Sequence, residues 1–492
     1  MPTKFLAQKN LKPTEAPAKN VFEHLQGGVL KGHGRDHTVQ LFFRFTGNAA
    51  QAKALMKALT AKVTSMTQQL ADSAAFKAGE TSRPFCSLFL TAKGYKALGF
   101  SAAKLAAAFP EPPSQIQLPN QVKFADGMAS HGPELGDPAP ATWEPGYADA
   151  AGKAVLDGMV LLANDSLPAL EFAAWDAARI VTAGGAEVLA TQAGLALFNK
   201  DKSQNLEHFG YVDGRSQPTY LQADRDREEH QFGGVSPWDP AEPVGRVLVP
   251  DALAPAADAG HSFGSFLVYR KLEQNVKGFK SKEQEVADAL GLTGDAREVA
   301  GAYAVGRFED GTPVVVRDRD GLNLPVPNNF VFSGPAGADP SGGKCPFHAH
   351  VRKVSPRGDS ANGNPDDALE RSHRITRRGI TYGTRTVEPK DDPTIDQMPT
   401  GGVGLLFMCF QASIDNQFAF MQRAWANSVG FVKPATGLDP VIAQPAGTVP
   451  VPQKWPNPYG TPAGATVGFE SFVTLRGGEF FFCPSLPFLK SL

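Results

Sequence analysis

The chain has few cysteines and no long apolar run. Its four cysteines are widely separated among 492 residues and form no CxxC pair, which excludes the disulfide framework of a small secreted protein. The clearest apolar stretch, residues 403–410, is far shorter than the roughly 18 residues of a membrane-spanning helix. Residues 1–20 lack the apolar segment of about 7–15 residues found in signal peptides. We therefore expect a cytoplasmic protein without membrane contact.

The chain also lacks an excess of either charge and any short internal repeat. Its 48 Lys and Arg residues against 50 Asp and Glu residues give a formal net charge of −2. No overall electrostatic field therefore attracts nucleic acid, and we expect no nucleic-acid partner. The absence of a repeat of about 20–50 residues argues against a solenoid or a propeller.

The sequence does contain β-rich segments, each followed by a helical pattern. Hydrophobic residues make up 42% and charged residues 20% of the chain, as in globular proteins, while 50 glycines and 40 prolines indicate many loops. The strand-then-helix order is found in residues 39–63, 86–100, 266–279 and 403–425. Two such units in each half predict an α+β fold, in which helices pack on one face of mainly antiparallel sheets.

Possible metal ligands are concentrated in the long loop-like segment 334–370. Cys345, His348 and His350 lie within six residues, and thiolate and imidazole groups are common metal ligands. A structural zinc ion normally has four such ligands, and no second cluster at zinc spacing follows. A single histidine can instead ligate a haem iron. On composition alone, a loop histidine without any metal remains a third interpretation.

Two further segments contain charged residues with ordinary alternative explanations. In EHFGYVDGRSQP, residues 207–218, Asp213 lies between two glycines, although Asp-Gly is also a common turn pair. In RITRRGITYG, residues 374–383, several arginines follow a strand-like pattern that could equally be a solvated edge strand.

Together and in this order, the segments resemble the dye-decolourising haem peroxidases. FGYVDGRSQP resembles the GxxDG element of that family, CPFHAHVRKVSPR its proximal-histidine element and RITRRGITYG its distal-arginine element. Residues 404–425 and 477–488 resemble the distal-pocket strand with its helix and the closing strand, so the resemblance extends from about residue 22 to the C-terminus. HLQGGVLKGHGRDH, residues 24–37, is similar to the larger, unsecreted members.

The resemblance implies a role for two residues of the proximal element. His350 follows a small residue and precedes the V-R-K run, so it is the expected iron ligand, ahead of His348 and His373. Arg357 ends the same element and occupies the position that binds a haem propionate, for which a guanidinium is well suited. Its alternative interpretation is a surface arginine.

The resemblance also implies a distal pair. Asp213 is expected to move a proton between the two oxygens of hydrogen peroxide, and Arg377 to stabilise the negative charge that develops as the O–O bond breaks. Arg378 would point to the opposite face. Leu405 and Phe407, two positions apart on a strand, would line the distal pocket, with ordinary core packing as the alternative.

The family fold consists of two ferredoxin-like domains with antiparallel sheets and peripheral helices. The resemblance places an N-terminal arm at 1–21, the first domain with the Asp213 motif at 22–225, a linker at 226–244 and the haem-binding domain at 245–492. It implies haem b as the cofactor. The expected reaction reduces hydrogen peroxide and oxidises dyes or phenolic donors in one-electron steps through an oxyferryl intermediate.

Two other functions compete with this interpretation. A haem-binding or haem-handling protein would use the same His350 but would need neither Asp213 nor Arg377, and a related-fold enzyme acting on chlorite would lack the Asp-Gly motif. Donors too large for the distal pocket would be oxidised at the surface, where the candidates are Trp143, Trp175, Trp238, Trp425, Trp455 and Tyr382. An aspartate as the base further predicts that dye oxidation is strongest at acidic pH.

Overall fold

Ten strands form one antiparallel sheet in the computed structural model, which describes all residues except 1, 82, 112–115, 117, 323–325, 445–451 and 463. The strands are β1 (His37–Phe45), β2 (Phe85–Leu90), β3 (Gly158–Asn164), β4 (Ala186–Leu195), β7 (Val249–Pro250), β8 (Phe263–Gln274), β9 (Thr376–Arg377), β10 (Ile380–Tyr382), β11 (Gly404–Gln411) and β14 (Val473–Cys483). Their order is β10-β11-β8-β14-β2-β3-β1-β4, with β7 paired to β8 and β9 to β11. Two small hairpins, β5 (Leu197–Phe198) with β6 (Asn205–Leu206) and β12 (Gln453–Trp455) with β13 (Ala465–Val467), lie outside the sheet.

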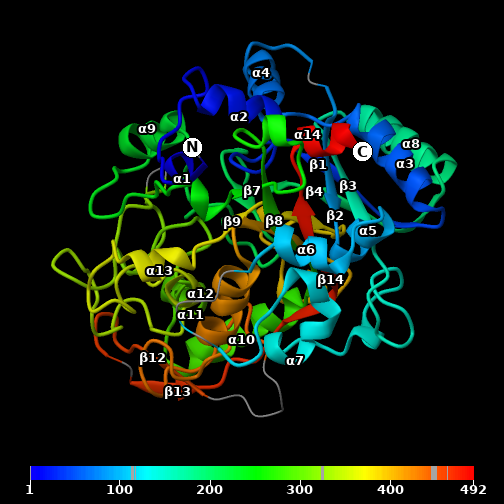
Figure 1. The fold of residues 1–492 in the computed structure, drawn as a ribbon. Coiled ribbons are helices and arrows are strands. Elements are labelled where there is room, and N and C mark those ends of the chain that lie inside the picture. The colour runs from blue at the N-terminus through cyan, green and yellow to red at the C-terminus, as the bar shows by residue number, and fades with distance from the viewer. Residues whose placement is uncertain are drawn as a thin grey trace.

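Helices surround the sheet (Figure 1), so the predicted α+β class is confirmed. They are α1 (Pro2–Leu6), α2 (Ala18–His24), α3 (Ala49–Thr60), α4 (Met66–Lys77), α5 (Ala92–Ala97), α6 (Ala102–Ala108), α7 (Gly132–Leu135), α8 (Leu167–Ala183), α9 (Gln222–Gln231), α10 (Val276–Ala289), α11 (Glu298–Val305), α12 (His350–Val354), α13 (Ala368–Ser372) and α14 (Leu486–Ser491). No helix in the described part of the chain is both long and apolar enough to span a membrane.

Each of the four predicted strand-then-helix units contains a strand, and three of the strands lead into α-helices. The unit at 403–425 differs, because β11 is followed by two π-helical turns, Ile414–Ala419 and Met421–Ala426. An α-helix and a π-helix can both bury one face, and Phe418, Met421 and Trp425 are all buried as their spacing predicts. Over so few residues, the spacing of apolar residues does not distinguish an α-helix from a π-helix. Wider turns of this kind often occur at functional sites, and this one borders the cavity that contains His350.

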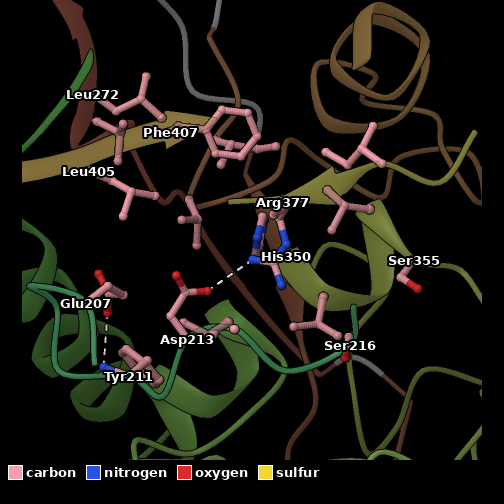
Figure 2. Close-up of a pocket in the computed structure, with 18 of the residues that line it drawn as sticks. Glu207, Tyr211, Asp213, Ser216, Leu272, His350, Ser355, Arg377, Leu405 and Phe407 are labelled. Carbon is pink, nitrogen blue, oxygen red and sulfur yellow. Dashed lines mark hydrogen bonds and ion pairs between the residues drawn. The ribbon is translucent and has the colours of Figure 1, made fainter. Parts of the chain in front are cut away.

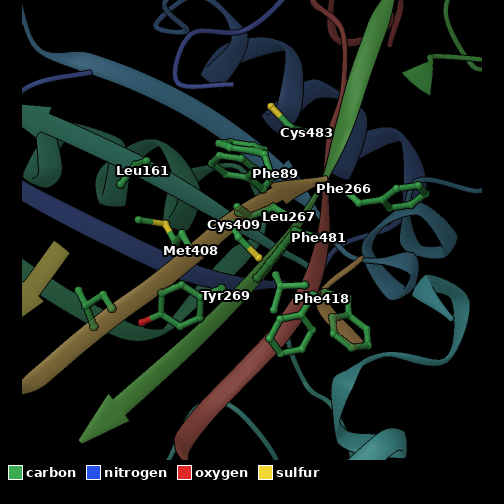
Figure 3. Packing of buried hydrophobic residues seen from close by; sticks show 14 of the residues in the cluster. Phe89, Leu161, Phe266, Leu267, Tyr269, Met408, Cys409, Phe418, Phe481 and Cys483 are labelled. Carbon is green, nitrogen blue, oxygen red and sulfur yellow. The ribbon is translucent and has the colours of Figure 1, made fainter. Parts of the chain in front are cut away.

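The sheet is curled, so that its two ends meet. Thr381 in β10 donates a hydrogen bond to the carbonyl of Leu195 in β4, although these strands stand at opposite ends of the strand order. Rings from non-adjacent strands therefore face one another inside the curve. Phe42 of β1 lies 4.8 Å from the ring centre of Tyr269 in β8 and 6.3 Å from that of Phe481 in β14. Figure 3 shows Tyr269 and Phe481 among the buried side chains of this core, whose packing makes the sheet a rigid support for the strands that carry the site.

Besides the contact between β10 and β4, the two halves of the sheet join at one short strand pairing. The first six strands come from the region predicted as the first domain, and β7–β14 from the region predicted as the second. Strand β14 pairs along its length with β8 but with β2 only at Phe482 and Leu90. Helix α9 continues across residue 225, so the predicted linker begins inside a helix.

Candidate active site

One cavity collects most of the predicted site residues (Figure 2). Asp213, His350, Arg377, Leu405 and Phe407 all line it, although they come from four different segments of the chain. Much of the remaining wall is apolar, from the described residues Val305, Val351, Val354, Ile375, Phe418, Met421 and Ile442. Such a space suits a flat, mainly apolar ligand that meets a few polar groups.

His350 stands at the start of α12 and is fixed by a buried carboxylate. Its Nδ1 lies 2.9 Å from Oδ2 of Asp439, whose side chain has no exposed surface. Burial alone would raise the pKa of Asp439, but the neighbouring His350 and the backbone N–H groups of Ile442 and Val441 lower it instead. An ionised acceptor requires the proton on Nδ1, which leaves the lone pair of Nε2 available to a metal ion.

The two competing histidines lie outside this cavity. His348 is buried edge-on against Trp455, with ring centres 4.4 Å apart, and burial together with Lys353 lowers its pKa to about 3. His373 stacks on Phe420 at 3.7 Å, and its Nδ1 donates to the carbonyl of Asn416. No group of three or more His, Cys, Asp or Glu side chains in the described ranges could hold a metal ion, so the zinc interpretation has no ligand set.

Asp213 and Arg377 form an ion pair at the cavity wall. Nη1 of Arg377 donates to Oδ1 of Asp213 at 3.0 Å, and the two side chains are 31% and 29% exposed. Nη2 of Arg377 donates to the carbonyl of Arg215 at 2.8 Å. Both charges therefore remain accessible to a small molecule while their relative position is fixed.

Each member of this pair is held by its own backbone. Arg377 lies in β9, where it pairs with Cys409 of β11. The Asp213 N–H donates to the carbonyl of Asn205 at 2.9 Å, and Gly214 follows at a φ of +83°, which glycine adopts without strain. Arg378, next in sequence, extends away from the pair and donates to the carbonyls of Gly28 and Val29.

Leu405 and Phe407 project from β11 into the same cavity. The strand is paired on one side with β8 and on the other with β9 and β10. Because side chains alternate along a strand, residues two positions apart share a face. The Phe407 ring lies 6.3 Å from that of Phe418 in the first π-helical turn.

Arg357 does not line the cavity. Its side chain is fully buried, and it donates to the carbonyls of Asn328 and Phe330, each at 2.8 Å, and to the Ser216 hydroxyl at 3.0 Å. The cavity wall is formed instead by Arg307, which bonds the same Ser216 hydroxyl at 3.2 Å. Arg307 is not among the residues predicted from the sequence.

The two arginines make this end of the cavity strongly cationic. Burial and the charges of Arg215 and Arg377 lower the pKa of Arg307 to about 9. Burial and the neighbouring Arg307 likewise lower the pKa of Arg357 well below its usual value. The side-chain donors of both arginines bond carbonyl, hydroxyl and amide oxygens. Buried cations of this kind favour an anionic ligand nearby.

Sequence reasoning also missed Glu207, which shapes the turn before Asp213. Its carboxylate accepts hydrogen bonds from the N–H groups of Phe209 and Tyr211, at 2.9 and 3.0 Å, and from Gln274 at 2.6 Å. Burial raises the pKa of Glu207 to about 7. The turn from Glu207 to Tyr211, drawn in Figure 2, directs the following residues towards the cavity.

These residues suit haem. A histidine with a free Nε2, apolar walls and a cationic end match the iron, the macrocycle and the propionates of that cofactor. Facing that space, an acid–arginine pair supplies the groups that peroxide chemistry needs. Fold and site together define a haem peroxidase.

Comparison with known proteins identifies the family. No family model matches the chain. It is 39% identical to the multifunctional dye peroxidase DyP2 of an Amycolatopsis species over the whole of both chains, and 28% identical to the dye-decolorizing peroxidase msp1 of Mycetinis scorodonius over 95% of this chain and 86% of that protein. The solved DyP2 structure superposes with a TM-score of 0.88, at 38% identity over 99% of this chain and 100% of that one. A DyP-type peroxidase from Anabaena gives 0.87, at 35% identity over 100% and 99%.

The chain therefore belongs to the dye-decolourising peroxidase family. The predicted two-domain ferredoxin-like fold and the predicted haem-peroxidase class are confirmed, and the haem-handling alternative is not favoured.

The first prediction concerns the iron ligand. His350→Ala should lose most bound haem, because it removes the only histidine that lines the cavity among the described residues. The haem absorption spectrum of purified protein measures this loss. His348→Ala and His373→Ala should keep the spectrum, and loss of the haem signature in His348→Ala alone would contradict the assignment.

A second prediction concerns the carboxylate behind that histidine. Asp439→Asn should weaken haem binding about 10–100-fold, as is typical when the partner of a ligating histidine is removed. Haem transfer to apomyoglobin measures the affinity. Asp251→Asn provides a matched control, since Asp251 is also buried and accepts backbone hydrogen bonds, but at Ser485 and Leu253. Equal haem transfer from both variants would show that Asp439 has no role in holding the ligand.

Proposed function

We propose that the protein binds haem b and uses it to reduce hydrogen peroxide while oxidising dyes and phenolic donors one electron at a time. The observation that carries this proposal is the single cavity that joins His350, backed by Asp439, to the Asp213–Arg377 pair. All four cysteines are buried and none lines the cavity. The cavity therefore offers no thiol to which a haem could be attached covalently, and we propose the non-covalent haem b.

The chain's own residues have separate tasks in this proposal. His350 would ligate the iron through Nε2, while Asp439 keeps the proton on Nδ1. Arg307 and, behind it, Arg357 would supply positive charge for the propionates. When bound, haem supplies the redox chemistry, passing two electrons to peroxide and recovering them singly from two donors.

Asp213 and Arg377 would act on the peroxide itself. Asp213 takes a proton from one peroxide oxygen and delivers it to the other, which leaves as water. Arg377 stabilises the negative charge on the leaving oxygen and, through its bond at 3.0 Å, orients the carboxylate. Leu405 and Phe407 exclude water from this region and limit the size of the molecules that reach it.

Large donors would have to react at the surface. Of the six aromatic candidates, Trp143, Trp238, Trp425, Trp455 and Tyr382 are buried, whereas Trp175 on α8 is 60% exposed. A bulky dye can therefore contact only Trp175 of this set. We also propose the domain boundaries predicted above, with haem held mainly by residues 245–492 and Asp213 contributed by the first domain.

The third prediction tests the distal pair. Asp213→Asn and Arg377→Leu should each leave haem bound but slow the reaction with peroxide about 10²–10⁴-fold, because each removes one proton-transfer or electrostatic group. Stopped-flow absorption after mixing with peroxide measures the rate. Arg476→Leu is the control, since Arg476 forms a half-exposed ion pair with Glu273 away from the cavity. A normal rate in both distal variants would contradict the proposed roles.

The fourth prediction concerns pH. Oxidation of an anthraquinone dye should be strongest in acid, because carboxylates in general titrate near 3.9 and histidines near 6.5, so an aspartate base works at lower pH. A steady-state profile within the range of haem retention measures this. Glu207, whose pKa is about 7, titrates near the same cavity and could shape the profile. An acid maximum that persists in Glu207→Gln belongs to the distal pair, whereas a maximum at or above neutral pH would refute the assignment of Asp213 as the base.

A further inference from the structure

A second cavity of about 670 Å³ adjoins the distal pair. It shares Asp213, Gly214, Arg215, Arg377 and Leu405 with the cavity lined by His350, which we call the haem cavity. The Asp213–Arg377 pair therefore lies between the two cavities. Its remaining wall comes from segment 32–35, the β5–β6 hairpin and the β9–β10 region, together with Gln217, Phe232 and Val326. We call it the outer cavity. Its volume lies within the range of about 300–1,000 Å³ typical of small-molecule sites.

The wall of the outer cavity is cationic. Among the described residues that line it, four are arginines and Asp213 is the single acid. Arg35 and Arg215 are paired with carboxylates behind the wall, those of Asp165 at 3.4 Å and Glu228 at 3.1 Å. Arg378 donates only to backbone carbonyls. Arg377 pairs with Asp213 in the wall itself. Arg378 forms no ion pair among the described residues, and Asp224 offsets its charge only from a distance, so a ligand anion can pair with it.

A neutral donor lies beside these arginines. Nδ1 of His33 accepts the backbone N–H of Arg35 at 3.0 Å. Burial, together with the charges of Arg35 and Arg378, lowers the pKa of His33 to about 4, so the ring is neutral at pH 7 and carries its proton on Nε2. His33 lines the outer cavity and can donate one further hydrogen bond there.

The same cavity has an apolar side. Leu197, Phe232, Val326, Ile380 and Leu405 line it, and the Phe232 ring lies 4.5 Å from the guanidinium of Arg215. A small inorganic anion would leave this apolar surface in water, whereas a neutral phenol would leave Arg378 without a paired anion. An aromatic ring that carries a carboxylate satisfies both sides.

We propose that the outer cavity binds a small aromatic carboxylate, such as a hydroxybenzoate, next to the distal pair. The role of this ligand as a donor rests on the proposed function. Two such phenols would each lose one electron and one proton, and one hydrogen peroxide would gain both electrons and both protons to give two waters. Binding itself needs no peroxide and is tested separately.

Calorimetric titration of the haem-loaded protein with 4-hydroxybenzoate and with neutral 4-hydroxybenzyl alcohol tests the proposal. The carboxylate should bind at least about tenfold more tightly, since it alone can pair with the arginines. The haem absorption spectrum should stay unchanged during the titration, because the ligand lies beyond the distal pair. Equal affinity for the two probes, or a spectral change showing that the carboxylate occupies the haem cavity, would overturn the proposal.

Charge-only variants locate the site. Gln204→Glu and Asn205→Asp each place a negative charge on the wall without a change of shape, and each should weaken carboxylate binding about tenfold while leaving alcohol binding unaltered. Gln51→Glu makes the same change at the exposed start of α3, where a glutamate also suits the capping box. This control should bind like the wild type. Carboxylate affinity that is unaffected by both wall variants would refute the location.

Dye turnover with peroxide, measured on the same preparations, keeps the two proposals apart. Turnover without selective carboxylate binding would support the peroxidase function and refute the outer-cavity site. Selective carboxylate binding without turnover would support the outer-cavity site and refute the peroxidase function.

Discussion

The ion pair between Asp213 and Arg377 is the constraint on which the active site depends. It joins the turn that ends the first half of the chain to a two-residue strand of the second, and it closes the wall between two cavities. Each partner is also held by its own backbone, through Asn205 and through Cys409. The pair is thus preorganised, so the two charges that we propose to act on peroxide need not rearrange during the reaction.

Residues that lie within short motifs could be predicted from the sequence. His350, Asp213 and Arg377 are predicted because each lies in a segment whose order and composition resemble one family. Leu405 and Phe407 are predicted because their strand resembles the distal-pocket strand of that family, and strand alternation places both on one face. Asp439 could not be found this way, since it reaches His350 across 89 residues through the fold alone. The contact of Arg357 with a propionate remains a prediction. In the structure its side-chain donors bond to the carbonyls of Asn328 and Phe330 and to the hydroxyl of Ser216.

The fold was predictable to the level of its class. Alternating and helical patterns located β1, β2, β8 and β11, and the antiparallel arrangement followed from the α+β interpretation. The contact between Thr381 and Leu195 brings β10 and β4 together at the two ends of the sheet. Nothing in the sequences of these two strands indicates that they meet. The π-helical turns after β11 could not be predicted from the sequence either, because their wider geometry depends on tertiary packing rather than on local periodicity.

The position of β14 affects how the protein is made. This strand, residues 473–483, follows the other nine strands of the sheet in the sequence, yet it lies in the middle of the sheet between β8 and β2. Before β14 has been synthesised, β8 and β2 therefore lack the strand that pairs with them there. Such open edges attract other strands until they are covered. Nascent chains should therefore need protection by chaperones until β14 has left the ribosome and paired.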